Sequence, residues 1–169
     1  MNEHIAKWRV YSERRDYLYR VAKLQPVVDR LFAEGLADGD VLMDVGAGTC
    51  ALGQYLRERG WRGLYVPVDA AVDGVDLAAW TPPAKVDWVV CLEVVEHLQA
   101  PLCFIDALGS AARKGLIVST PNPAVVNVAA LDSTHVSEVS VEEFAALGME
   151  YRVVWGGETI LAWASERTA

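Results

Sequence analysis

One short stretch, residues 41–48 (Val-Leu-Met-Asp-Val-Gly-Ala-Gly), constrains the fold of this chain more than any other. Its apolar residues predict a buried strand, and its glycines predict a tight turn that leads into a helix. Gly46 and Gly48 have no Cβ, so the turn can adopt positive φ and a ligand can lie directly against the main chain. The backbone N–H groups at the start of the next helix would point at that ligand. The stretch therefore predicts a strand, turn and helix with a binding site for a nucleotide-like ligand at the turn.

The residue that precedes the glycines indicates which ligand binds. The spacing Gly46-x-Gly48-x-x-Ala51 also satisfies the fingerprint of dinucleotide-binding proteins, in which the turn holds a pyrophosphate. Asp44, however, places a carboxylate where a dinucleotide-binding strand normally has an apolar residue. A carboxylate favours a cation, and S-adenosylmethionine has an α-ammonium group and no phosphate. We therefore favour S-adenosylmethionine over NAD, and a turn that serves packing alone is the third interpretation.

Two later strands are consistent with this interpretation. The strand predicted over residues 63–68 ends at Asp69, about twenty residues beyond the glycine turn, where a parallel neighbour would present a carboxylate to ribose hydroxyls. The strand predicted over residues 86–91 runs into the segment Glu93-Val-Val-Glu96-His97. Together the three strands predict one sheet edge that carries acidic and imidazole groups.

With these motifs and the later Ser119-Thr-Pro-Asn122, residues 38–165 resemble the class I S-adenosylmethionine-dependent methyltransferases, in the branch with an EVxEH segment after the fourth strand. A full-length member has a helix, a further strand and a second helix between Asp69 and Val86, and this chain is too short there to hold them. We expect a loop with a short strand over residues 75–77, which would still flank the adenine. The resemblance implies that the cofactor is held by Asp44, Gly46, Ala47, Gly48, Asp69, Ala70, Leu77 and Cys91.

The order of the predicted elements indicates the fold class. Residues 3–34 are predicted to form one or two helices with Pro26 as a break, and strands then alternate with helices, which is typical of right-handed crossovers and a parallel sheet. Two closing strands joined by Gly156-Gly157 should pair antiparallel. We expect an α/β fold with a Rossmann-like doubly wound sheet, mostly parallel with an antiparallel C-terminal strand and trimmed between strands 2 and 4. The expected organisation is a single domain over residues 1–169, with an N-terminal helical cap (1–36) and a core (37–169).

Glutamate and histidine side chains follow the strand that ends near residue 91. Glu93, Glu96 and His97 stand at i, i+3 and i+4, so they would share one face of a helix that began there. His135 lies on a long segment after the fifth strand, which should pass over the same sheet edge. Carboxylates and imidazoles can form much of a site for a divalent metal, with Mg²⁺, Mn²⁺, Fe²⁺ and Zn²⁺ as candidates. The pattern resembles the ubiquinone-pathway O-methyltransferases and the 2′-O-methyltransferases of small-RNA 3′ ends, in which a matching Glu-x-x-Glu-His and a later His hold a metal that grips substrate oxygens.

Two other interpretations of this group stay open. In the first, no metal binds and His97 or His135 acts as the general base, because imidazole ordinarily titrates near neutral pH. In the second, these side chains only cap or orient the loop and take no part in chemistry.

Composition and charge limit the remaining functions. The chain has 169 residues and a net charge of −8, which argues against a protein whose main task is to grip long nucleic acid. Basic residues gather in the first thirty positions, where they form a solvated face or guide an anionic substrate. No run approaches the ~20 apolar residues that span a bilayer, so we expect a cytoplasmic protein without a membrane partner. Cys50, Cys91 and Cys103 show neither disulfide nor zinc spacing, so we expect reduced thiols.

We therefore expect an S-adenosylmethionine-dependent methyltransferase that acts on an oxygen atom of a small-molecule acceptor. An RNA-end 2′-O-methyltransferase is the nearest alternative, which the glutamate and histidine pattern permits and the net charge disfavours. A cofactor-binding module without turnover, such as an activating partner subunit, is an alternative of another class, because the short region after Asp69 would leave the pocket open. The oligomeric state is not determined by one sequence.

Overall fold

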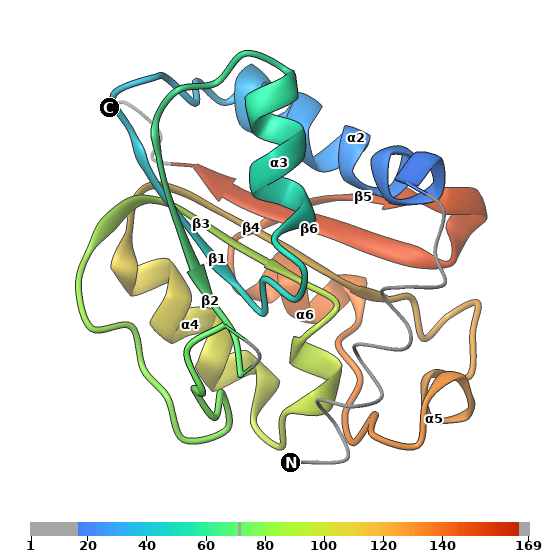
Figure 1. Cartoon of the computed structure of the whole chain (residues 1–169). Coiled ribbons are helices and arrows are strands. Elements are labelled where there is room, and N and C mark those ends of the chain that lie inside the picture. Colours follow the sequence, from blue (N-terminus) through green and yellow to red (C-terminus); the bar gives the residue numbers. More distant parts are fainter. Residues whose placement is uncertain (1–16, 71, 166–169) are drawn as a thin grey trace.

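The computed structural model describes residues 17–70 and 72–165, which contain a six-stranded sheet with the strand order β2-β1-β3-β4-β6-β5 (Figure 1). Strand β1 pairs in parallel with β2 and β3, and β3 pairs in parallel with β4. Strand β6 runs antiparallel to both β4 and β5. The predicted Rossmann-like sheet with an antiparallel C-terminal strand is confirmed. The strands are β1 (Val41–Val45), β2 (Leu64–Val68), β3 (Val86–Leu92), β4 (Ala112–Pro121), β5 (Glu150–Val154) and β6 (Thr159–Ser165).

Helices cover both faces of the sheet, as a doubly wound fold requires. Helices α2 and α3 lie on one face, and α4 and α6 lie on the other (Figure 1). None of the helices in residues 17–70 and 72–165 is both long enough and apolar enough to cross a membrane. The helices are α2 (Tyr17–Ala33), α3 (Ala51–Glu58), α4 (Pro101–Ala111), α5 (Val128–Leu131) and α6 (Val141–Ala146), with 3₁₀ turns η1 (Val95–His97) and η2 (Trp155–Gly157).

Alternation of side chains along the strands builds a separate core on each face. On the α2 and α3 side, Leu31 and Leu56 pack against Val90 and Ile117, and all are fully buried. On the α4 and α6 side, the core includes Leu108 and Phe144 together with neighbouring side chains of β3 and β4. Burial of each such side chain contributes roughly 1.5–3 kcal/mol, so the two cores hold the strands in register at the edge that carries the site.

Two local expectations are wrong and a helix from Glu93, which was considered as a condition, does not form; each outcome has a physical reason. Pro26 lies inside α2 and does not end it, because the adjacent Val27 is fully buried and packs on the sheet. No strand forms at residues 75–77, because Val75 and Leu77 pack inward against the core from a loop of turns. No helix begins at Glu93, because its N–H still donates to the carbonyl oxygen of Ser119 in β4 at 3.0 Å. Residues 1–16, which carry most of the basic N-terminal residues, lie outside the described part of the chain.

Candidate active site

The carboxyl ends of three adjacent parallel strands meet at one edge of the sheet. Residue Val45 of β1 pairs with Val68 of β2 on one side and with Cys91 of β3 on the other. The glycine turn, Asp69 and the segment from Glu93 onward therefore begin side by side. Open α/β sheets bind their ligands at this edge.

The two glycines of the turn meet different requirements. Gly46 has φ 78°, and a Cβ there would lie 2.1 Å from Cγ2 of Val94, so the close packing of the next loop excludes any side chain. Gly48 has φ 53°, and a Cβ there would meet no atom within 4 Å. The Gly48 N–H donates to Oδ2 of Asp69 at 2.9 Å, which directs that carboxylate toward the turn. The open space over Gly48 is where a ligand can approach the backbone.

Asp44 is a buried carboxylate directly beneath this turn. It is 3% exposed, and it accepts a hydrogen bond through Oδ2 from the hydroxyl of Tyr65. Burial raises the pKa of Asp44 to about 7, with a further rise from the nearby Asp69 charge, while the Tyr65 hydrogen bond lowers it. A bound cation would remove the cost of this buried charge, so the environment of Asp44 favours a positively charged ligand group.

The other residues implied in cofactor binding differ in accessibility. The Ala47 N–H donates to the Val68 carbonyl at 3.3 Å and helps to shape the turn, and Ala70 is exposed beside Asp69. Leu77 is half-buried and packs against the core on the α4 side. Cys91 has no exposed surface and forms part of the same core.

A second group of ligand-type atoms lies at the end of β3. Glu96, His97 and His135 each offer a donor atom, and these atoms lie within 4.8 Å of one another. The two imidazole rings meet edge to face, with 4.7 Å between their centroids and 66° between their planes. The structure thus brings together residues that are 38 positions apart in the sequence.

Backbone contacts bring His135 to this position. The N–H groups of Val136 and Ser137 donate to the Glu96 carbonyl at 2.9 and 3.1 Å. The Ser137 hydroxyl also donates to the Val95 carbonyl at 3.1 Å. These bonds fasten the segment after α5 onto η1, so the position of His135 follows from the backbone of the segment.

Hydrogen bonds also determine the tautomers of both imidazoles. Nδ1 of His135 lies 2.7 Å from the Val128 carbonyl oxygen, which can only accept, so Nδ1 carries the proton. Nδ1 of His97 lies 3.2 Å from the carbonyl oxygen of Thr134, and the Thr134 hydroxyl donates its own proton to Asp132 at 2.8 Å. In the neutral form, both rings therefore have their lone pair on Nε2. A histidine that donates Nδ1–H to a backbone carbonyl and offers Nε2 is the usual arrangement of a metal ligand or a general base.

The two glutamates of the segment have different environments. Glu96 is 1% exposed and accepts a hydrogen bond from the Thr120 hydroxyl at 3.2 Å. Burial, together with the nearby Glu93 charge, raises the pKa of Glu96 to about 8. Glu93 has φ 55° and accepts a hydrogen bond from the Ser119 hydroxyl at 2.7 Å. Glu93 does not belong to the close group of donors, although it was predicted as a ligand beside Glu96.

Several side chains that support the site were not singled out by the sequence patterns. Tyr65 holds Asp44, Thr134 fixes the tautomer of His97, and Thr120 contacts Glu96. Tyr65 sits in an ordinary strand pattern, so no local signal marks it. Thr120 and Thr134 lie in the segments Ser119–Asn122 and Asp132–His135, whose polar residues stand out, but their partners depend on the tertiary fold.

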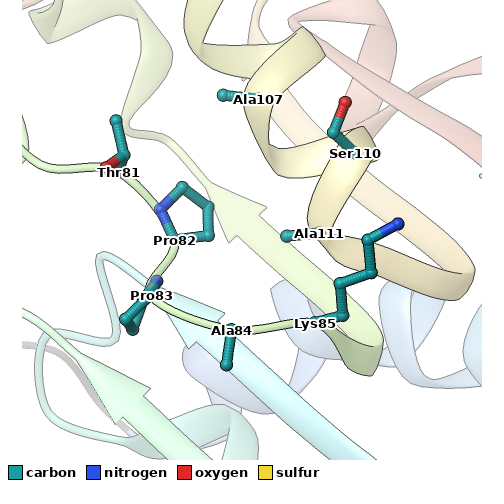
Figure 2. Close-up of a pocket in the computed structure, with 8 residues that line it drawn as sticks. All are labelled: Thr81, Pro82, Pro83, Ala84, Lys85, Ala107, Ser110 and Ala111. Atoms are coloured by element: carbon teal, nitrogen blue, oxygen red, sulfur yellow. The ribbon is translucent and has the colours of Figure 1, made fainter.

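A separate hollow lies at the opposite edge of the sheet. It has a volume of about 330 Å³ and lies between the loop before β3 and the end of α4 (Figure 2). Its lining includes one ammonium group, Lys85, and the hydroxyls of Thr81 and Ser110. Because β3 begins at Val86, this hollow is at the amino end of the strand, away from the glycine turn. It contributes nothing to the candidate active site.

Comparisons with known proteins agree with this geometry. A family model described as a methyltransferase domain matches residues 11–152. No curated protein matches the chain. The fold is similar to magnesium protoporphyrin IX methyltransferase from Synechocystis PCC 6803 with bound SAM, with 18% identity, a TM-score of 0.64 and coverage of 88% of this chain and 80% of that one.

Two further solved structures show the same fold. The plantazolicin methyltransferase BpumL in complex with SAH is 13% identical, with a TM-score of 0.67 and coverage of 95% of this chain and 88% of that one. A chain from the complex that contains the Haloferax volcanii Trm112 methyltransferase activator is 12% identical to this chain, with a TM-score of 0.66. The match covers 99% of this chain and 96% of that one. At these identities the likeness concerns the fold.

Proposed function

Because the chain belongs to the methyltransferase-domain family, we propose that it transfers a methyl group from S-adenosylmethionine to an oxygen atom of a small-molecule acceptor. One observation carries this proposal. The acidic glycine turn at the end of β1 and the group Glu96, His97 and His135 after β3 lie at the same sheet edge. The first can bind the cofactor, and the second can bind and deprotonate a hydroxyl.

The residues around the turn fit S-adenosylmethionine, which supplies an electrophilic methyl group when it is bound. Asp44 would accept hydrogen bonds from the α-ammonium group, since its buried carboxylate favours a cation. Gly48 leaves the backbone open to the ligand, and Asp69 directly follows the neighbouring strand β2, where its carboxylate can accept from ribose hydroxyls. A pyrophosphate would place negative charge against Asp44, which disfavours a dinucleotide.

The residues after β3 fit a divalent metal. Glu96 offers a buried carboxylate, and His97 and His135 offer imidazoles whose Nδ1–H groups are held by backbone carbonyls. This mixed oxygen and nitrogen donor set suits Mn²⁺, Fe²⁺ or Zn²⁺, and Mg²⁺ suits it less because Mg²⁺ prefers oxygen ligands. Such an ion would act as a Lewis acid that lowers the pKa of an acceptor hydroxyl.

The same group can work through its imidazoles alone. Nε2 of His97 or His135 would then accept the proton of the acceptor hydroxyl, and the fixed Nδ1–H bonds would keep the ring oriented for the transfer. In both forms Glu96 and the two histidines act on the acceptor, and Asp44 and the glycine turn act on the cofactor. Dialysis against a chelator separates the two forms, because only the metal-bound form loses turnover and regains it when one of these ions is restored.

Because the histidines would act on the acceptor and the glycine turn would bind the cofactor, replacing a histidine should affect turnover and not cofactor binding. We expect His97→Ala and His135→Ala to lower turnover by about 10²-fold or more, because each removes a group that binds or deprotonates the acceptor. Calorimetry should show that both variants keep the affinity for S-adenosylhomocysteine within about twofold, which is a change of less than 0.5 kcal/mol. Glu138→Gln, an exposed change on the same segment, is the matched control and should retain both properties. An equal loss of cofactor binding would make the histidines structural.

The acceptor class is tested by product formation. The purified chain, with radiolabelled S-adenosylmethionine, should methylate hydroxyl groups of phenolic small molecules and not RNA 3′ ends. Transfer to RNA ends alone would replace the small-molecule proposal with the 2′-O-methyltransferase. Tight cofactor binding without transfer to small molecules, RNA or cell extract would identify a binding module without turnover.

A further inference from the structure

Strand β2 carries a tyrosine that reaches the cofactor carboxylate from the neighbouring strand. Leu42 pairs with Tyr65 in the β1–β2 register, and Asp44 lies two residues further along β1 on the same face of the sheet. The Tyr65 hydroxyl donates to Oδ2 of Asp44. This bond uses one carboxylate oxygen and leaves Oδ1 for a second donor.

A glycine inside α3 makes room for this tyrosine. A Cβ on Gly53 would lie 2.6 Å from Cε1 of Tyr65 and 2.7 Å from Cδ1 and Cζ, so any larger residue would displace the ring. A glycine within a helix is unfavourable relative to alanine, and here it leaves room for the Tyr65 ring, whose hydroxyl reaches Asp44.

We propose that Tyr65 is a positioning residue of the cofactor site, which orients the Asp44 carboxylate so that its second oxygen meets the ammonium group of the cofactor. This inference rests on the proposed cofactor site and adds a residue to it. Tyr65 itself is placed under α3 and touches the reaction only through Asp44.

The charges around Asp44 explain what the hydroxyl of Tyr65 does. Burial and the Asp69 charge both raise the pKa of Asp44, and the hydrogen bond from Tyr65 opposes them. Without the hydroxyl, Asp44 would ionise at a higher pH, and a neutral carboxyl binds an ammonium group poorly. Among the described residues, the titratable groups that interact with Asp44 are Tyr65, Asp69 and Cys50, together with Cys91 from the core on the other face of the sheet.

Tyr65→Phe tests the inference, because it keeps the ring and removes only the hydroxyl. Calorimetry with S-adenosylhomocysteine between pH 6 and 8.5 should show roughly tenfold weaker binding at pH 7, as expected for the loss of a hydrogen bond to a charged group. The binding curve should move to higher pH, so that the loss of affinity is smaller at the alkaline end. The part of the loss that comes from an unoriented carboxylate should remain there. Tyr55→Phe is the matched control, since the Tyr55 hydroxyl contacts Arg59 and not Asp44.

Other outcomes distinguish the positioning role of Tyr65 from the proposed cofactor site. If Tyr65→Phe binds like the wild type at every pH, or loses affinity equally at every pH, the positioning role is wrong and the cofactor site remains. If the wild type itself does not bind S-adenosylhomocysteine, the proposed function fails, and the inference fails with it. Should Tyr65→Phe fold poorly in a thermal melt, Gly53→Ala provides a second test, because it displaces the ring, keeps the hydroxyl and should shift the binding curve in the same direction.

Discussion

At the scale of single residues, Asp44 shows how the proposed binding site conflicts with the stability of the free protein. Its carboxyl is 3% exposed, and its pKa is raised to about 7 from an ordinary value of 3.8. The unfolded chain therefore loses this proton at a lower pH than the folded chain does. Between these two values the unfolded state binds fewer protons, so the free energy of unfolding falls as pH rises from about 4 to about 7 and is level above that.

The fall in the free energy of unfolding between about pH 4 and about pH 7 leads to a prediction for Asp44→Asn. We expect the variant to be more stable than the wild type at pH 8 by about 1–4 kcal/mol, because it removes a buried charge. At pH 4, where the wild-type carboxyl is largely neutral in the folded state, the two proteins should melt at similar temperatures. Thermal melts at both pH values, read by circular dichroism, measure the difference. The same variant should lose affinity for S-adenosylhomocysteine, whereas lower stability than the wild type at pH 8 would contradict the assigned environment of Asp44.

At the scale of elements, the turn between β1 and α3 shows that two glycines of one motif have different tasks. Gly46 is confined by Val94, which belongs to the loop after β3, so its requirement comes from packing between two strand ends. At Gly48 only the backbone conformation, with φ 53°, favours glycine, because a Cβ there would meet no other atom. The motif thus combines one position that is fixed by packing with another that leaves space for the proposed ligand.

The two positions should respond differently to alanine. Gly46→Ala must displace Val94, and we expect a loss of about 1–3 kcal/mol of folding stability, as for an overpacked core. Gly48→Ala should cost only about 1 kcal/mol, from the left-handed backbone, and should lower the affinity for S-adenosylhomocysteine by filling the open space. Urea unfolding and calorimetry on both variants separate these effects. Equal stability losses, with cofactor binding retained in Gly48→Ala, would refute the distinction.

The elements also show which features local sequence patterns can predict. The apolar run of β1 and the glycine turn led to the correct strand and helix, because local periodicity and turn chemistry determine both. Pro26 was misjudged because tertiary packing of α2 outweighs the local preference of proline. The helix considered at Glu93 does not form because the Glu93 backbone stays hydrogen-bonded to β4, a contact between distant segments that no local pattern contains. Tyr65 was missed for the same reason.

At the scale of the whole molecule, strand β2 lies at the edge of the sheet. In the described residues, β2 pairs with β1 and with no strand on its other side. Pro67 lies within β2 and has no N–H to offer to a further strand, and Leu64 is 60% exposed. Proline is a common device that protects an edge strand from unwanted pairing. Strand β2 is therefore the edge strand in the described part of the chain, next to the strand ends that lead to Asp69, Asp44 and Glu96.

The most direct test of the central claim is a crystal structure of the chain with S-adenosylhomocysteine. We expect density for the ligand over Gly48, with its α-ammonium group within hydrogen-bonding distance of Asp44 and its ribose hydroxyls at Asp69. We also expect Tyr65 to keep its contact with Asp44, and the group Glu96, His97 and His135 to lie on the side of the ligand sulfur. Ligand density elsewhere on the molecule, or an ammonium group directed away from Asp44, would contradict the claim that this buried carboxylate selects the cofactor.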